Sequence, residues 1–152
     1  QRDEFAELPA MLDQAAAWVA AQPVGESPQE LALRLMWSAG QNDQAALTAQ
    51  SQRLLSAQQP DGGWRQQADF PSDAFATGQA LVALRSAGVP ASDPAIQRGI
   101  QFLGRTQSAD GSWPMKSRPH PENGSVARNL NPITYAGTAW AVAGLLACLP
   151  VK

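Results

Sequence analysis

Apolar side chains recur at helical spacing along most of the chain, and no segment shows the strict alternation that is typical of a strand. Ile96, Ile100 and Leu103 lie at positions i, i+4 and i+7 and therefore share one side of a helix. Asp93 and Pro94 come just before them, and an aspartate followed by proline is a common helix start. This pattern predicts a helix with one buried face and one solvated face.

Other segments are apolar on almost every side, which predicts buried helices. The clearest of them, residues 73–87, begins at Asp73 and ends before Gly88, and these residues are typical start and stop signals. The remaining helices are predicted at about 3–21, 29–39, 43–57 and 133–149. Since 29–39 and 133–149 are apolar nearly all round and 43–57 has two distinct faces, we expect six helices in which outer, solvated helices alternate with inner, dry ones.

A short motif recurs after 49 positions. Segment 58–64 reads QQPDGGW and segment 107–113 reads QSADGSW, so that glutamine, aspartate, glycine and tryptophan return in register. The paired residues are Gln58 and Gln107, Asp61 and Asp110, Gly62 and Gly111, and Trp64 and Trp113. Four identities at a single offset indicate an internal repeat.

The repeat extends beyond this motif in both directions. Upstream, the Ser-Ala-Gly of 38–40 returns at 86–88, a shift of 48. Downstream, residues 76–81 face residues 137–142 at a shift of 61, which exceeds 49 by twelve and indicates a twelve-residue insertion, 114–125. A single helix pair cannot bury both of its faces, so we expect three antiparallel pairs to stack into an open arc.

Composition narrows the possible functions. The formal net charge is −2, and the chain has no basic cluster of the kind that binds nucleic acid or anionic lipid. With one cysteine, Cys148, and one histidine, His120, it has too few ligands for a zinc site, and no metal or cofactor is predicted. The long uncharged run 129–151 is interrupted by Pro132 and Pro150, which favours a buried helix over a transmembrane span.

The start of the chain gives a weak indication of its origin. It begins at Gln1 and shows no charged segment followed by an apolar stretch, which is the pattern of a secretory leader. This start slightly favours a processed secreted or periplasmic protein. We expect residues 1–152 to form a single repeat domain that is a segment of a larger protein.

The second copy of the motif, together with the helix before it, resembles a complete QW motif. This is the repeat of squalene-hopene cyclases, oxidosqualene cyclases and related prenyltransferase-like proteins. In the second copy the preceding helix contains Arg98-Gly99. The first copy keeps the glutamine and the Gly-x-Trp but has Ala49-Gln50 at the positions that correspond to Arg98-Gly99. Residues 18–22 resemble a third copy that has lost its turn. The resemblance implies an all-α fold of the α/α toroid type, here six helices in a partial, open barrel.

In such a fold the motif residues brace the junction between an outer helix and the next inner helix. An Asp-Gly turn supplies a left-handed backbone position, and a glutamine amide binds the freed groups at a helix end. An aromatic cage for a cation is the less favoured alternative for Trp64 and Trp113. The predicted structural residues are Gln58, Asp61, Gly62, Trp64, Arg98, Gly99, Gln107, Asp110, Gly111 and Trp113.

The resemblance does not extend to a catalytic acid. Squalene-hopene cyclases protonate an alkene from an Asp-x-Asp-Asp motif at the start of an inner helix. Here Asp73 and Thr77 match that segment, but Phe75 takes the place of the proton donor and Ala76 that of its neighbour. We therefore predict no catalytic residue, and Asp73 is interpreted as a helix N-cap.

Related active sites are not matched either. The zinc ligands of protein prenyltransferases and the thioester signature of complement-type proteins have no counterpart. A triad of Ser112, His120 and Asp110 has nothing in its order or setting to support it. If the chain is an enzyme at all, a squalene cyclase-like isomerase or lyase is implied.

The insertion is predicted to lie at the rim from which the concave surface of the arc opens. Long loops are either functional or plain connectors, and the solvated connector is the favoured interpretation here. The aromatic residues of the inner helices either line an apolar pocket or pack in the core. The candidate ligand-binding residues are Asp73, Phe75, Arg118, His120, Tyr135 and Trp140.

Two functional hypotheses follow. The first is a non-catalytic module that binds another domain or protein, or an apolar, isoprenoid-like ligand, and that can oligomerise through its open ends. The alternative is a part of a larger terpenoid cyclase-like enzyme, of the squalene-hopene type, whose catalytic acid lies outside this segment. Because helix N-termini and Arg118 are positive, an amphipathic molecule with an anionic end suits the rim best.

Overall fold

The structure, a computed structural model, describes residues 7–23, 25–41, 43–118, 122, 124–126 and 128–150. Within these residues it contains six α-helices and no strand, apart from an isolated bridge between Trp64 and Asp73. The helices are α1 (Leu8–Ala21), α2 (Pro28–Gln41), α3 (Gln44–Ser56), α4 (Ala74–Ser86), α5 (Pro94–Thr106) and α6 (Asn131–Ala147). The predicted all-α class is confirmed.

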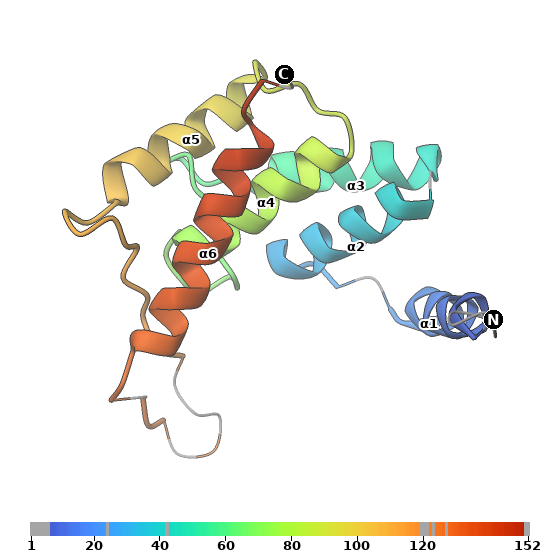
Figure 1. Ribbon diagram of the computed structural model, residues 1–152, viewed down its shortest axis with the longest axis horizontal. Helices are drawn as coiled ribbons and strands as arrows, with labels where there is room; N and C mark the ends of the chain where they lie inside the picture. The colour runs from blue at the N-terminus through green and yellow to red at the C-terminus, as the bar shows by residue number, and fades with distance from the viewer. Residues whose placement is uncertain are drawn as a thin grey trace, which may run out of the picture.

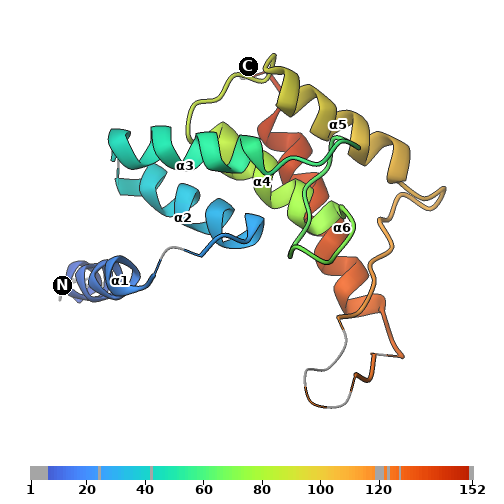
Figure 2. The same ribbon diagram turned by 180° about the vertical axis from the view of Figure 1, so that it is seen from behind.

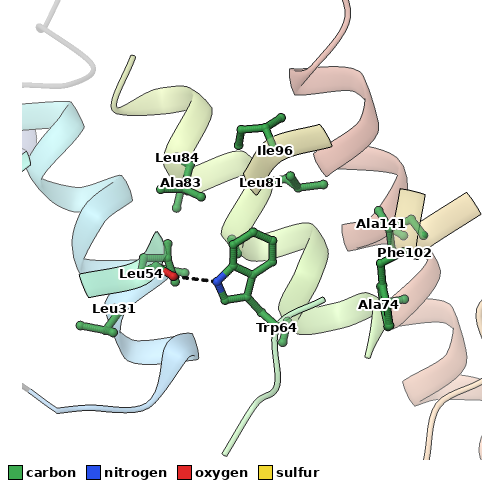
Figure 3. Close-up of a cluster of buried hydrophobic side chains, with 14 of the residues drawn as sticks. Leu31, Leu54, Trp64, Ala74, Leu81, Ala83, Leu84, Ile96, Phe102 and Ala141 are labelled. Carbon is green, nitrogen blue, oxygen red and sulfur yellow. Dashed lines mark hydrogen bonds between the residues drawn. The ribbon is translucent and has the colours of Figure 1, made fainter. Parts of the chain in front are cut away.

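Helix α4 lies at the centre of the arrangement. It packs between α2 and α6, and α3 and α5 also contact it (Figures 1 and 2). The main hydrophobic core surrounds Trp64, Leu81 and Leu84, all of which are fully buried. Figure 3 shows how residues from α2, α3, α5 and α6 close around them.

Helix α1 lies apart from this core, beyond α2 (Figure 1). Its connection to the rest runs through Arg34 of α2, whose guanidinium donates to the carbonyl oxygens of Val19 at 3.3 Å, Gln22 at 3.1 Å and Pro23 at 2.7 Å. Arg34 therefore binds carbonyl groups of the last turn of α1 and of the two residues that follow it. The arrangement of the six helices in three antiparallel pairs stays a prediction.

Local signals set the helix ends. Asp43, Asp73 and Asp93 each precede a helix and accept a backbone N–H of its first turn, at 3.1, 2.8 and 2.8 Å respectively. Gly88 follows α4 with φ +86°, a conformation that favours glycine. The earlier Ser-Ala-Gly differs, because Gly40 lies inside α2 and Ser38 is buried whereas Ser86 is exposed. The two Ser-Ala-Gly segments thus both lie at the end of a helix, but the first is within the last turn of α2 and the second runs past the end of α4.

The two Gln-to-Trp segments, called here the first turn (58–64) and the second turn (107–113), have the same internal geometry. Gly62 has φ +85° and Gly111 has φ +86°. Gln58 Nε2 donates to the Gly62 oxygen and Gln107 Nε2 to the Gly111 oxygen, both at 2.9 Å. Each glutamine amide therefore closes its own turn.

The two tryptophans also make matching contacts. Trp64 Nε1 donates to the Leu54 oxygen of α3 at 2.7 Å, and Trp113 Nε1 donates to the Leu103 oxygen of α5 at 2.9 Å (Figure 3 for Trp64). Their backbone N–H groups donate to the hydroxyls of Thr77 at 3.0 Å and Thr138 at 3.1 Å. Each tryptophan therefore ties an outer helix, through its indole, to the inner helix that follows its turn, through its backbone N–H.

Candidate functional site

The candidate site is built around the start of α4. Asp73 has extended backbone geometry, and its N–H donates to the Trp64 oxygen at 3.0 Å, so the first turn fixes its position. One carboxylate oxygen accepts the Ala76 N–H at 2.8 Å, and the other accepts Gln66 Nε2 at 2.7 Å. Both oxygens therefore have a donor, as expected of an N-cap residue.

A chain of polar contacts joins Asp73 to the insertion. Arg118 donates from Nη2 to Gln66 Oε1, and the same nitrogen donates to Gln29 Oε1 at 3.1 Å. Gln29 belongs to the first turn of α2, and Gln66 bridges from Arg118 to Asp73. The insertion is thus attached to the starts of two inner helices, α2 and α4, through a single guanidinium.

Burial dominates the electrostatics of Asp73. Loss of hydration raises its pKa above the ordinary value of 3.8, and this outweighs the lowering effects of the Ala76 N–H, the Gln66 amide, the Phe75 N–H and the Arg118 charge. The folded state consequently holds a proton on this carboxyl more tightly than an unfolded chain does. The stabilisation from that proton is complete below the unfolded pKa and is lost as the pH rises through the raised folded pKa.

We predict a pH signature for this group. Asn also caps helices well, so Asp73→Asn keeps the cap and removes the buried charge. The free energy of unfolding of Asp73→Asn, relative to the parent, is expected to increase as the pH is raised from acid to neutral. Urea denaturation at several pH values checks this, with the exposed Asp69→Asn as the control for losing one charge. A difference that does not change with pH contradicts the assignment.

An open cavity lies beside this polar chain. Its volume is about 400 Å³, and it is lined by Gln66, Phe75, Met115, Lys116, Ser117, Arg118, Ile133 and Ala136. We call it the rim cavity. Phe75 stands edge-to-face against Trp140 of α6, with ring centroids 6.3 Å apart and an interplanar angle of 72°. Apolar walls and a cationic edge thus meet in one hollow between the starts of α4 and α6.

The predicted ligand-binding residues fall into three groups. Asp73, Phe75 and Arg118 come together at the rim cavity or beside it, and Trp140 joins them through its contact with Phe75. Tyr135 is 78% exposed and does not line this cavity. His120 lies outside the described residues. The beginning of the insertion is packed, since Met115 is buried and its N–H donates to Thr134 Oγ1 at 3.3 Å.

Sequence reasoning missed two residues of the site, Gln66 and Met115. They occupy equivalent places in the repeat, 49 positions apart, and their partners Asp73 and Thr134 are 61 positions apart. The junction before α4 is therefore polar, whereas the equivalent junction before α6 places Met115 against Gly137. The register of the repeat pairs Gln66 with Met115 but does not by itself mark either residue as part of a site.

The described part of the chain gives little support for metal binding, thiol chemistry or a membrane span. No cluster of histidine, cysteine and carboxylate side chains there is arranged to hold a metal ion. Burial raises the pKa of the Cys148 thiol, with Arg85 opposing, so the reactive thiolate is disfavoured. None of the described helices has the length and apolar character needed to cross a membrane.

Nearly the whole chain is similar to a known protein family. A family model described as "Squalene-hopene cyclase C-terminal domain" matches residues 2–152. No curated protein matches the chain at a significant level. The family match is continuous across both turns, the start of α4 and the insertion, so every residue of the rim cavity lies within it.

Proposed function

The chain belongs to the squalene-hopene cyclase C-terminal domain family, and we propose that it serves as a non-catalytic binding module of this family. Its ligand is an amphipathic molecule, either an isoprenoid-like lipid or a peptide, with an anionic end. The observation that carries the proposal is the rim cavity, in which an apolar hollow adjoins a guanidinium. Cavities of this size that combine apolar walls with converging polar groups are typical ligand sites, and here Gln66, Lys116, Ser117 and Arg118 supply the polar groups.

The two ends of the rim cavity suit the two ends of such a ligand. Phe75, Ile133 and Ala136 supply apolar wall for a chain or an apolar side chain. Arg118 is bound to two neutral amide oxygens, which orient its guanidinium without neutralising its charge. A carboxylate or phosphate in contact with it gains a charge-assisted hydrogen bond.

The start of α4 supports a role without catalysis. Protonation of an alkene requires a carboxyl group whose proton points to the substrate. Phe75 and Ala76 stand where the family's acidic residues are expected, and both oxygens of Asp73 already accept hydrogen bonds. The side chains at this position therefore favour holding a ligand over converting it.

Binding of palmitate provides the test. Calorimetry with the purified chain is expected to show binding that weakens about tenfold in Arg118→Ala, which corresponds to about 1.4 kcal/mol. The matched control is Arg53→Ala, an exposed arginine of α3 outside the rim cavity. Hexadecanol, which has the same chain without the charge, is expected to bind equally to the parent and to Arg118→Ala. Failure of palmitate to bind, or equal binding by Arg118→Ala, contradicts the proposal.

One observation favours a second candidate function, a cyclase-like enzyme in which Asp73 itself takes part, and this differs from the alternative in which the catalytic acid lies outside the segment. The raised pKa of Asp73 keeps this carboxyl closer to the protonated state that an acid catalyst needs. With squalene as substrate, we expect no cyclised product from the purified chain by gas chromatography. Product that disappears in Asp73→Asn would show that Asp73 takes part in cyclisation and would contradict the non-catalytic role.

A further inference from the structure

The amide of Gln66 is fixed from both of its ends. Its Nε2 donates to Asp73 Oδ2 at 2.7 Å, and its Oε1 accepts from Arg118 Nη2. An ionised carboxylate can only accept hydrogen bonds and a guanidinium can only donate them, so one orientation of the amide satisfies both neighbours. Because Gln66 is only 8% exposed, little water can reach the amide to replace a lost partner.

Protonation of Asp73 removes this agreement. Its Oδ1 accepts the Ala76 N–H, which leaves Oδ2, the oxygen that faces Gln66, as the place for the proton. The new O–H is a donor, and Gln66 Nε2 is a donor as well. Turning the amide by half a turn brings Oε1 to the O–H but directs Nε2 at the guanidinium of Arg118, where two donors again meet. The proton on Asp73 and the contact between Arg118 and Gln66 therefore compete.

Few charges act on this carboxyl. Among the described residues, Arg118 is the one charge that shifts the pKa of Asp73, and it lowers that pKa against the loss of hydration. Helix α6 contributes no charged side chain, and His120 lies outside the described residues. The other charged residues on the surrounding elements are Lys116 of the insertion, Asp61, Arg65 and Asp69 of the first turn and the loop after it, Glu30 of α2, and Arg105 of α5.

We propose that Gln66 couples the protonation of Asp73 to the attachment of Arg118: the guanidinium is held beside the rim cavity while Asp73 is ionised and is released from Gln66 when Asp73 takes up a proton. We call these three residues the latch. Opening it moves one proton from water to Asp73 Oδ2 and turns one amide. Gln29, at 3.1 Å, is then the remaining partner of Arg118.

Closure of the latch and protonation of Asp73 oppose each other. The ionised carboxylate favours the closed latch, so by linkage the closed latch lowers the pKa of Asp73 relative to the open one. The latch is closed above the folded pKa of Asp73 and opens as the pH falls through it. Because burial raises that pKa above 3.8, the latch opens at a higher pH than the one at which an ordinary aspartate takes up its proton.

The equivalent junction before α6 has no such latch. Met115 stands 49 positions after Gln66. Thr134 stands 61 positions after Asp73, and its Oγ1 accepts the Met115 N–H at 3.3 Å. This contact contains no group that titrates. Gln66→Met therefore gives the first junction the apolar side chain of the second, and it serves below as the variant without a relay.

Asp73→Asn tests the latch at a single pH. Asparagine keeps the helix cap but offers Gln66 an N–H donor in place of a carboxylate oxygen, as the protonated carboxyl does. At neutral pH we expect a lower proton–nitrogen nuclear Overhauser effect at the Arg118 backbone amide than in the parent, because the released residue moves more freely. The control is Asp93→Asn, the same change at the cap of α5, which is expected to leave Arg118 unchanged.

Titration of the Asp73 carboxyl carbon by nuclear magnetic resonance tests the reverse direction. Arg118→Ala is expected to raise the proton affinity of Asp73 about threefold or more, because a contact that favours the ionised form is lost. In a Gln66→Met background, the same Arg118→Ala change is expected to have little effect, since the amide that joins the two groups is absent.

Two results would overturn the inference. One is an Arg118 that is as rigid in Asp73→Asn as in the parent. The other is an effect of Arg118→Ala on the proton affinity of Asp73 that is equal with glutamine or methionine at position 66, because the charge would then act directly and not through the amide. Both measurements use the chain without ligand, so failure of palmitate to bind concerns the proposed function and not the latch.

Discussion

Replacing Trp64 by alanine is expected to lower the free energy of unfolding by about 3–5 kcal/mol, the range for removing a fully buried aromatic side chain. Trp64 is 0% exposed and its indole donates to the Leu54 oxygen. The substitution leaves a cavity between α3, α4 and α5 and removes one of the two hydrogen bonds that the Leu54 oxygen accepts, while the bond from the Ala57 N–H remains. Urea denaturation followed by circular dichroism measures the loss.

The equivalent change, Trp113→Ala, is expected to cost a similar amount, about 3–5 kcal/mol, because Trp113 is 3% exposed and makes the matching bond to Leu103. Trp64→Phe and Trp113→Phe separate the hydrogen bond from the packing, since phenylalanine keeps much of the buried area without the N–H donor. A loss below about 1 kcal/mol for either alanine variant would place its indole at the surface and would contradict the equivalence of the two turns.

The features that were predictable from the sequence depend on residues close together in the chain. Asp73 and Asp93 cap the helices that follow them, Gly88 ends α4 with a positive φ, and the repeated Asp-Gly forms the same turn twice. Each of these signals acts within about one turn of helix, so a linear pattern contains it. The six helix positions follow for the same reason.

The contacts of the candidate site could not be predicted in the same way, because they join residues that lie far apart in the chain. Arg118 reaches Gln29, 89 positions earlier, and Gln66, 52 positions earlier. No local pattern selects these glutamines from the others. The choice of Tyr135 shows the same limit, because it is 78% exposed and does not line the cavity although it lies on the helix whose residues Ile133 and Ala136 line it. Rotation of a helix about its axis is set by packing, not by composition.

Gly78 shows how a close approach of two helices can be invisible in a sequence. Within α4 it resembles any tolerated glycine, and alanine at that position has the higher helix propensity by about 1 kcal/mol. In the structure, a Cβ at Gly78 would collide with the Trp140 oxygen and lie 2.7 Å from the Ala141 nitrogen, both of them backbone atoms of α6. These atoms cannot move aside without displacing the whole helix.

Gly78→Ala is therefore expected to destabilise the fold by about 3 kcal/mol, in spite of the gain in helix propensity, because α6 must shift away from α4. Gly104→Ala is the matched control: Gly104 also lies in a helix, α5, but no atom stands within 4 Å of the place that a Cβ would take there, so that variant is expected to gain roughly 0.5–1 kcal/mol. Urea denaturation of both variants gives the comparison. If both substitutions stabilise the chain, α4 and α6 do not touch at Gly78.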